Sequence, residues 1–322
     1  MSSPILGLHH VTAVASDPQT NVDFYAGVLG LRLVKKTVNF DDPSTYHLYY
    51  GDGVGSPGTV MTFFPRQSVR RGALGSGQTH TTAFAVPEHS LDFWRQRLEQ
   101  SSVRSQDVER FGAPGLAFVD PDGLQLELLA RARPDDRREP WNGSSVPAEQ
   151  AIRGFDSVTL LHADGIATER VLVEAMGFRK VAVDGNRARY ESGSGGSGTF
   201  VDLLHDPDAA RGRVAGGSVH HIAFRVADDD AQATWRKRLF DAGHPTTEVK
   251  DRMYFHAIYF REPGGVLFEL ATDNPGFATD ESVDELGTGL RLPPWMESDR
   301  QRIEHTLPSL VDPPVQKPGE AA

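Results

Sequence analysis

The sequence lacks cysteine altogether, although it is 322 residues long. This absence excludes disulfides, thiolate nucleophiles, iron–sulfur clusters and zinc-ribbon sites in one step. If the protein holds a metal ion, its ligands must be histidine, carboxylate or other oxygen donors. The composition therefore directs the search for a site to those residue types.

Positive charge and long apolar runs are also scarce. The chain has 33 lysines and arginines against 44 aspartates and glutamates, so its formal net charge is −11. This balance argues against DNA or RNA as a partner, because polyphosphates require clustered cations. The sequence contains no apolar run of about 18 residues, so we expect no membrane span. The N-terminus lacks the basic-then-apolar pattern of a secretory signal, and we expect a cytoplasmic location.

Four segments of the sequence resemble one another. Each is rich in residues that favour strands and ends in an acidic residue, and they cover residues 8–17, 79–88, 155–164 and 219–228. A helical pattern of apolar residues follows each segment, and each unit then ends in strands. The last of these strands cover residues 58–64, 123–129, 198–204 and 265–271. The sequence therefore predicts four βαβββ units that start near residues 7, 79, 154 and 218.

A charged stretch at residues 131–147 separates the second unit from the third. It contains Pro134, Pro140 and Pro147, which is typical of a linker. We expect an N-terminal domain over residues 1–135 and a C-terminal domain over residues 150–275, each with two units. The repeat stops after Asn274. Residues 276–322 form an expected C-terminal extension, with one helix within residues 297–307 and a frayed end from residue 312.

Several short stretches resemble a known superfamily. They are LHHVT at residues 8–12, YHLYY at 46–50, GTVMTFF at 58–64, VHHIAF at 219–224 and PGGVLFE at 263–269. With the paired βαβββ units, they resemble the vicinal oxygen chelate superfamily of glyoxalases, bleomycin-resistance proteins, fosfomycin thiol transferases and type I extradiol dioxygenases. Within it, the sequence is most similar to ring-cleaving dioxygenases that act on hydroquinones. The resemblance covers about residues 5–275. It implies an α+β fold in which four βαβββ modules form two cupped half-barrel sheets.

The resemblance also implies metal ligands on the first and last strand of each contributing unit. The repeat-equivalent residues are His10, Thr81, Ser157 and His221 on the first strands, and Thr62, Glu127, Asp202 and Glu269 on the last strands. Units one and four together offer His10, His221 and Glu269, with Thr62 as a poor fourth ligand. Two histidines and one carboxylate suit Fe(II), with Mn as the alternative. Units two and three offer no imidazole at these positions, so we expect one metal.

A second histidine precedes each predicted histidine ligand. Neighbours on an ideal strand point to opposite faces, so both histidines of a pair reach one site only if the strand contains a bulge. We expect His9 on the far face of the sheet. In the resembling enzymes a histidine at the position of His220 lies near the site, which makes His220 a candidate catalytic residue.

Two further residues, Tyr259 and Arg252, are catalytic candidates. Tyr259 precedes Glu269 across a predicted hairpin and matches a tyrosine that donates a hydrogen bond to a metal-bound phenolate. A packed strand tyrosine is the alternative interpretation. Arg252 is a candidate for stabilising a developing anion, and a surface arginine is its alternative.

Three more polar residues lie within or near these motifs. Thr12 shares the strand face of His10 and is predicted to line the pocket and bind substrate. His47 belongs to a stretch shared with the superfamily, but the sequence does not say whether it faces the cup. His256 is a further candidate whose role stays open.

The resemblance implies an Fe(II)-dependent ring-cleaving dioxygenase that inserts O2 into a hydroquinone or related phenol. Such an ion binds both the phenolate and O2 and lets an electron pass between them. A glyoxalase-like lyase or isomerase is one alternative, although Thr62 stands where such an enzyme needs a carboxylate. A non-catalytic, aromatic-binding resistance protein is another. The expected partners are a small aromatic substrate and O2, and a homo-oligomer is an open expectation.

Overall fold

The structure is a computed structural model that describes residues 3–132 and 139–313. Its first two units follow the predicted order of one strand, one helix and three strands, with η marking short 3₁₀- or π-helical turns. They consist of β1 (Leu8–Ala15), α1 (Pro18–Val22), η1 (Asp23–Val28), β2 (Arg32–Asn39), β3 (Asp42–Gly51), β4 (Val60–Pro65), β5 (Gln78–Pro87), η2 (Glu88–Ser90), α2 (Leu91–Gln100), β6 (Ser105–Arg110), β7 (Ala113–Val119) and β8 (Gln125–Arg131).

The third and fourth units repeat this order. They consist of β9 (Phe155–His162), α3 (Ile166–Arg170), η3 (Val171–Ala175), β10 (Arg179–Asp184), β11 (Arg187–Glu191), β12 (Phe200–His205), β13 (Ser218–Val226), α4 (Asp229–Asp241), β14 (Lys250–Asp251), β15 (Phe255–Arg261) and β16 (Leu267–Pro275). The βαβββ repeat predicted from the sequence is therefore confirmed. None of the described helices is both long and apolar enough to span a membrane.

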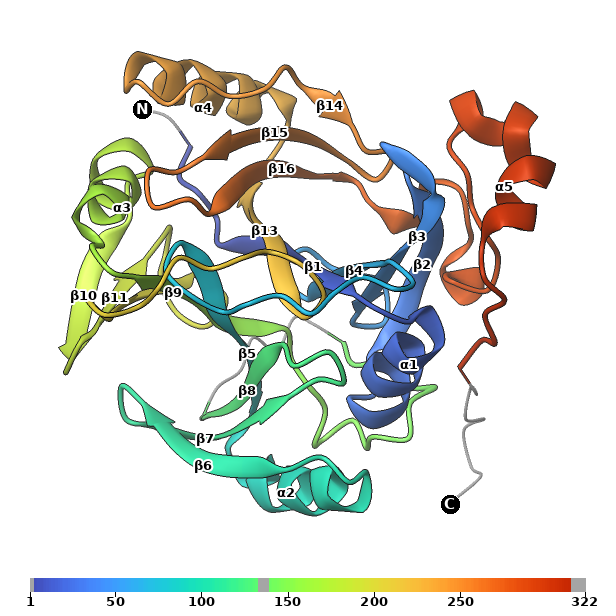
Figure 1. The fold of residues 1–322 in the computed structure, drawn as a ribbon, viewed down its shortest axis with the longest axis horizontal. Coiled ribbons are helices and arrows are strands. Elements are labelled where there is room, and N and C mark those ends of the chain that lie inside the picture. The colour runs from blue at the N-terminus through green and yellow to red at the C-terminus, as the bar shows by residue number, and fades with distance from the viewer. Residues whose placement is uncertain (1–2, 133–138, 314–322) are drawn as a thin grey trace.

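The described strands form two eight-stranded sheets. One of them, called the site sheet below, has the order β14-β15-β16-β13-β1-β4-β3-β2 and combines units one and four. The other, called the partner sheet, has the order β10-β11-β12-β9-β5-β8-β7-β6 and combines units two and three. Figure 1 shows both sheets curled, with α2 and α4 on the outside. This arrangement confirms the expected pair of half-barrel sheets.

The two units of each sheet meet through their first strands. In the site sheet β1 pairs antiparallel with β13, and in the partner sheet β5 pairs antiparallel with β9. Each sheet therefore combines strands from both halves of the chain. The expected domains at residues 1–135 and 150–275 do not coincide with the sheets, and their separate folding stays a prediction. Residues 133–138 of the expected linker lie outside the described residues.

The apolar core lies on one face of these strands, and the polar residues of interest lie on the other. Val11 of β1 is fully buried in the main core, and it alternates with His10 and Thr12. Because side chains alternate along a strand, His10 and Thr12 point to the opposite, concave face. The two longest helices cover the outside, where Trp94 of α2 and Trp235 of α4 are buried.

Turns of one sheet contact helices of the other. Asp120, in the turn between β7 and β8, accepts a hydrogen bond of 3.1 Å from the hydroxyl of Tyr25 in η1. At the equivalent turn between β15 and β16, Glu262 accepts one of 2.6 Å from Thr168 of α3. All four side chains are buried. These two contacts join the site sheet to the partner sheet at related positions of the repeat.

Residues 276–313 pack along the outer strands β2 and β3 of the site sheet (Figure 1). They contain η4 (Phe277–Thr279), η5 (Val283–Glu285), η6 (Pro294–Asp299) and α5 (Arg300–Thr306). The predicted helix at residues 297–307 is therefore divided between η6 and α5. Most of the expected frayed end, residues 314–322, lies outside the described residues.

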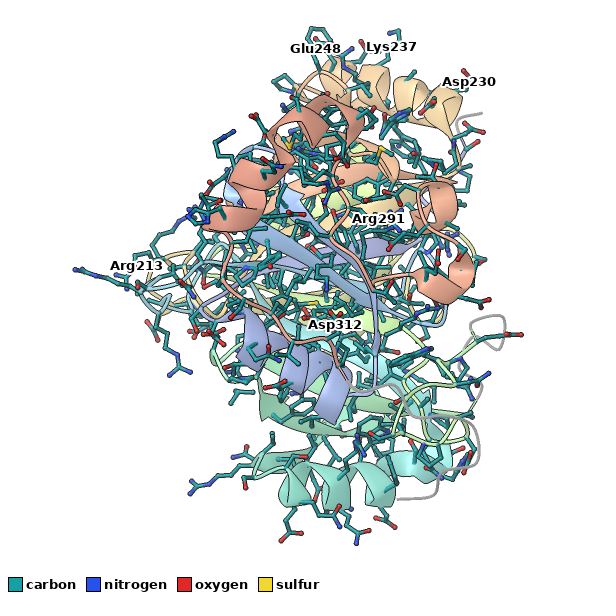
Figure 2. All side chains as sticks on the ribbon, turned by 90° about the vertical axis from the view of Figure 1, so that its right-hand side faces the viewer. Arg213, Asp230, Lys237, Glu248, Arg291 and Asp312 are labelled. Atoms are coloured by element: carbon teal, nitrogen blue, oxygen red, sulfur yellow. The ribbon has the colours of Figure 1, made fainter. Side chains whose placement is uncertain are left out.

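Ion pairs made by two buried lysines fix this extension to β2. Lys35 is fully buried and pairs with Asp280 at 2.6 Å and with Glu281. Lys36 pairs with Asp312, which is labelled on the face shown in Figure 2. A buried lysine needs such partners because an unpaired charge is costly away from water. The extension is thus held against the outer strand β2 of the site sheet.

Candidate metal centre

Strand register places the three predicted ligands in the middle of the site sheet. His10 of β1 lies opposite Ala223 of β13, and Ala223 lies beside Glu269 of β16. The small side chain of Ala223 therefore stands between the two candidate ligands. His221 lies opposite Thr12 in the next row. Residues two apart on a strand share a face, so all of these side chains project from the same side of the sheet.

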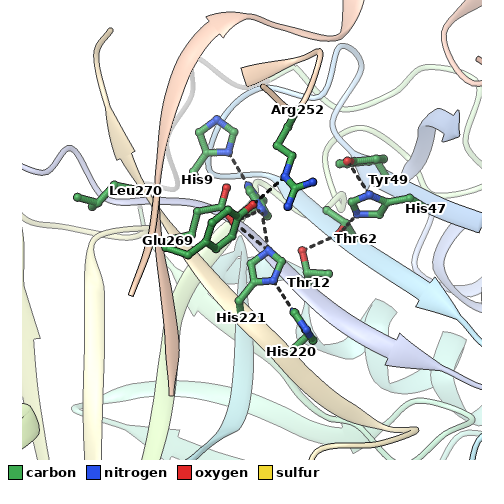
Figure 3. Close-up of polar contacts among 12 residues, drawn as sticks. His9, Thr12, His47, Tyr49, Thr62, His220, His221, Arg252, Glu269 and Leu270 are labelled. Atoms are coloured by element: carbon green, nitrogen blue, oxygen red, sulfur yellow. Dashed lines mark hydrogen bonds and ion pairs between the residues drawn. The ribbon is translucent and has the colours of Figure 1, made fainter. Parts of the chain in front are cut away.

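The side chains of His10, His221 and Glu269 converge on a common point (Figure 3). The Nε2 atoms of His221 and His10 lie 3.0 and 3.3 Å from Oε2 of Glu269, and the two nitrogens are 3.2 Å apart. The candidate ligand atoms all lie within 4.8 Å of one another, and the three residues are buried. Residues 3–132 and 139–313 contain no second group of three histidine or acidic side chains placed this closely.

The chemistry of this group fits a divalent metal ion. Glu269 is fully buried, and within the described chain neither of its carboxylate oxygens has a partner in hydrogen-bond geometry. A buried carboxylate is costly unless a cation or hydrogen bonds satisfy it. Burial lowers the pKa of His221, so its imidazole is neutral and offers a lone pair. Burial opposes ionisation of Glu269, but the imidazoles of His10 and His221 hold its pKa well below the usual range.

Paired β-bulges explain how adjacent histidines reach one site. The pairing of β1 with β13 leaves His9 unpaired on one strand and His220 unpaired on the other. A bulge residue kinks its strand and re-aims its side chain. The Nδ1 atoms of His9 and His10 lie 2.9 Å apart, so the expectation that His9 occupies the far face was wrong. The partner sheet has the same irregularities at His80 and Asp156, which makes the bulge a feature of the repeat.

His9 sets the tautomer of His10. Its Nε2 lies 3.1 Å from the backbone carbonyl of Thr272, and because a carbonyl only accepts, Nε2 of His9 donates. Burial lowers the pKa of His9 well below its usual value, so the ring is neutral and its Nδ1 is an acceptor. His10 must then donate from Nδ1. This directs Nε2 of His10 at the candidate metal position, as expected for a metal-binding histidine.

His220 repeats this arrangement on β13. Its Nδ1 lies 2.8 Å from Nδ1 of His221, so His221 also presents Nε2 to the centre. Unlike His9, His220 lines the cavity that opens beside the centre. Desolvation lowers the pKa of His220 to about 3, so its ring is neutral at neutral pH. The structure brings His220 to the site, and its catalytic role stays a prediction.

A cavity of about 600 Å³ opens in front of the centre. His10 and His221 line it, together with Tyr259 and Arg252. Much of the remaining wall is apolar and consists of Val14, Phe40, Phe64, Val69, Val214, Ala215, Phe255 and Leu267. Apolar and aromatic walls with a few convergent polar groups suit a small aromatic ligand whose polar atom reaches the centre.

Tyr259 and Arg252 lie beside the centre as a pair. Tyr259 is the strand neighbour of Glu269, and its ring centre is 5.8 Å from that of His221. Nε of Arg252 donates to the hydroxyl of Tyr259 over 3.2 Å. Burial raises the pKa of Tyr259 well above its usual value, so it stays protonated. Since the phenol oxygen accepts from Arg252, the phenol hydrogen is available to a ligand. Both residues reach the site, and their catalytic roles stay predictions.

Thr62, at the fourth repeat-equivalent position, belongs to a chain of four polar side chains. The hydroxyls of Thr12 and Thr62 are 2.8 Å apart, and His47 Nε2 lies 2.8 Å from the Thr62 hydroxyl. The Tyr49 hydroxyl lies 2.8 Å from His47 Nδ1. Thr12 is fully buried and is not among the residues that line the cavity, so its predicted substrate contact stays a prediction. Sequence reasoning missed Tyr49, although its spacing from His47 on β3 indicates a shared face. His256 pairs with an aspartate of α4 away from the cavity.

The partner sheet fills the equivalent positions with ion pairs. Glu127, the equivalent of Glu269, is bound by Arg110 at 2.5 Å. Asp202 is bound by both ends of the Arg189 fork at 2.8 and 2.9 Å. These carboxylates are already neutralised by arginine, so this sheet offers no comparable group of ligands within the described residues. That the protein binds a single metal ion stays a prediction.

The fold and the converging ligands define the class of this protein. A sequence profile of the Glyoxalase/Bleomycin resistance protein/Dioxygenase superfamily matches residues 7–128 and 87–270. The chain belongs to this superfamily. It is 46% identical over 307 residues to "Putative ring-cleaving dioxygenase MhqO" of Bacillus subtilis (strain 168), covering 95% of this chain and 97% of the relative.

Other similarities extend over most of the chain. It is 38% identical over 308 residues to the chlorohydroquinone/hydroquinone 1,2-dioxygenase of Sphingobium indicum, covering 94% of this chain and 95% of the relative. A crystal structure from Bacillus subtilis subsp. subtilis str. 168 superposes with a TM-score of 0.91 at 44% identity and covers 98% of this chain and 100% of that chain. Glyoxalase I from Zea mays shares the fold, with a TM-score of 0.61 at 16% identity over 83% of this chain and 92% of that chain.

We predict that Glu269→Gln weakens metal binding by more than about 100-fold, because losing a ligand costs more than losing a residue behind it. Chelator competition with the reconstituted protein measures this affinity. Glu127→Gln makes the same change at the equivalent position of the partner sheet and should leave the affinity unchanged. Equal affinities for wild type and Glu269→Gln would reject the ligand set.

We also predict that His9→Phe weakens metal affinity by about 10- to 100-fold, because the acceptor that fixes the His10 tautomer is lost. The same competition assay applies, with His80→Phe as the control because His80 occupies the equivalent bulge of the partner sheet. A His9→Phe protein that binds metal as tightly as His80→Phe would contradict the tautomer argument.

Proposed function

We propose that this chain is an Fe(II)-dependent, extradiol-type dioxygenase that opens the ring of a hydroquinone or related phenol by inserting O2. The observation that carries the proposal is the group of His10, His221 and Glu269 beside a cavity with aromatic walls. Relatives named as ring-cleaving and hydroquinone dioxygenases support it. Mn is the alternative ion for the same ligands.

The ligand group is suited to this chemistry because it has only three protein ligands. His10, His221 and Glu269 would hold the ion and leave further coordination positions open. A bound Fe(II) would bind a phenolate oxygen and O2 and would supply a path for an electron between them. His10 and His221 line the cavity, so a ligand in the cavity has access to those positions.

The cavity wall would orient the ring of the substrate. The ring of Phe255 lies 4.9 Å from that of His10, and the ring of Phe64 lies 5.7 Å from that of His220, measured between centres. Both phenylalanines line the cavity. Aromatic rings prefer offset or edge-to-face contacts with a bound ring, so these side chains limit its orientation. Their apolar surface also excludes water from the reacting atoms.

Three polar side chains would handle charge and protons. The free phenol hydrogen of Tyr259 would be donated to the substrate oxygen. The guanidinium of Arg252 would stabilise negative charge that develops on the substrate. His220 is neutral and accepts from His221 at Nδ1, so its Nε2 carries the hydrogen and would donate a hydrogen bond to an oxygen atom of the ligand.

The geometry favours this reaction over the glyoxalase-like alternative. Such an enzyme would use a carboxylate at the position of Thr62. The Thr62 hydroxyl is instead buried between Thr12 and His47. A non-catalytic binding protein would have no need of a buried ligand group. A cytoplasmic location and a homo-oligomer remain predictions from the sequence.

Oxygen consumption tests the proposed reaction. The protein is first reconstituted with Fe(II) in the absence of air. We expect it to consume O2 when hydroquinone and aerated buffer are then added. Mass spectrometry should detect a ring-opened product with two added oxygen atoms. Zn(II)-loaded protein should be inactive, because zinc has no redox chemistry. Iron-loaded protein that binds hydroquinone but consumes no O2 would exclude the dioxygenase and favour the binding-protein alternative.

Tyr259→Phe should lower turnover by about 100-fold or more, because one preorganised donor to a developing charge is lost. Metal content and hydroquinone affinity without air should change much less. Tyr190→Phe in the partner sheet is the matched control and should retain wild-type turnover. Unchanged turnover of Tyr259→Phe would show that this tyrosine only packs in the strand.

A further inference from the structure

We propose that Asp41 is a positioning residue that holds the guanidinium of Arg252, and through it the hydroxyl of Tyr259, in place for the reaction. This inference rests on the proposed function, since it concerns how the dioxygenase site is held. Asp41 and Arg252 are 211 residues apart in sequence, and their side chains meet at 3.0 Å. They close the cavity from opposite edges of the site sheet.

Asp41 lies at the tip of a tight turn. Strand β2 ends at Asn39 and β3 begins at Asp42, and these two residues pair across the hairpin. The backbone N–H of Asp41 donates to the side chain of Asn39 over 2.9 Å. Asn39, Phe40 and Asp41 all line the cavity. Strand β14, which precedes Arg252, is the opposite edge strand of the same curled sheet. The curl therefore brings this turn to Arg252.

Two anchors fix the plane of the Arg252 guanidinium. Nε donates to the Tyr259 hydroxyl over 3.2 Å, and Nη2 donates to Oδ2 of Asp41 over 3.0 Å. Nη1 makes no hydrogen bond to any described residue. Because a guanidinium is a planar fork, two anchors fix the direction of the third nitrogen. Figure 3 shows the Arg252 fork between the ligand group and His47. The third nitrogen is thus available to an anionic ligand oxygen in the cavity.

The backbone fixes only the start of this long side chain. Arg252 donates its N–H to the carbonyl of Phe255 over 3.0 Å. The next residue, Met253, has a φ of 69°. A non-glycine residue in this left-handed region is uncommon and marks a tightly determined turn. The guanidinium, several bonds away, still needs its own anchors.

The cavity wall offers Arg252 no second carboxylate among the described residues. Asp41 is the one acidic side chain among the described residues that line the cavity. The remaining charged side chains there, Arg66, Lys250 and Arg252, are all cations. Arg66 has its own partner, Asp42. Without Asp41, the guanidinium would keep only its contact with Tyr259 and would lose its fixed plane.

A double-mutant cycle tests this inference. We expect Asp41→Asn to lower both kcat/KM and hydroquinone affinity without air by about fivefold, the upper end for a partly exposed ion pair. In an Arg252→Ala background the same substitution should have no effect, because its partner is gone. Asp41→Glu keeps the carboxylate and should therefore retain most of the wild-type kcat/KM and hydroquinone affinity. Asp42→Asn breaks the neighbouring pair with Arg66 and serves as the matched control, with values within twofold of wild type.

The outcomes separate this inference from the proposed function. Two results would show, in wild-type protein that consumes O2, that Asp41 does not act through Arg252. One is that Asp41→Asn has the kcat/KM and hydroquinone affinity of wild type. The other is that Asp41→Asn lowers these values by the same factor in the Arg252→Ala background as in wild type. If wild type binds hydroquinone but consumes no O2, the dioxygenase proposal fails, and the cycle on hydroquinone affinity still decides the role of Asp41. Absence of hydroquinone binding by the metal-loaded wild type would overturn both.

Discussion

The antiparallel pairing of β1 with β13 is the constraint on which the candidate centre depends. It joins the first strand of the chain to a strand more than 200 residues later and places His10 and His221 in neighbouring rows of one sheet. Glu269 reaches the same point because β16 runs parallel to β13, with only the methyl group of Ala223 in between. If this pairing slipped by one residue, the three side chains would turn to opposite faces and the group would be lost.

The bulges convert that pairing into a site with support behind each ligand. An ideal strand would send His9 and His220 to the far face, where neither could contact a ligand. The unpaired residue on each strand instead lies against the Nδ1 atom of the following histidine. The two supports differ in their surroundings. His9 is closed off against a backbone carbonyl, whereas His220 lines the cavity. Both supports therefore fix the tautomer of a ligand, and His220 in addition presents its Nε2–H to the cavity.

The sequence was sufficient to predict the repeat, because four similar units align with one another. The resemblance to the superfamily then implied His10, His221 and Glu269 as ligands, and the structure brings these three side chains together. The sequence was insufficient for His9, because a bulge changes the face of one residue and leaves no mark in an alternating pattern. Asp41 was out of reach for a different reason. Its contact with Arg252 depends on the curl of the whole sheet, which no local pattern encodes.

The two sheets also show how one fold meets the same electrostatic demand in two ways. Each sheet buries a carboxylate at the equivalent position of its last strand, and a buried carboxylate needs a cation. In the partner sheet Arg110 supplies it to Glu127, and the position is closed to any other ligand. In the site sheet no arginine reaches Glu269 among the described residues, and the imidazoles of His10 and His221 face it instead. A metal ion held by His10, His221 and Glu269 would meet, in the site sheet, the demand that arginine meets in the partner sheet.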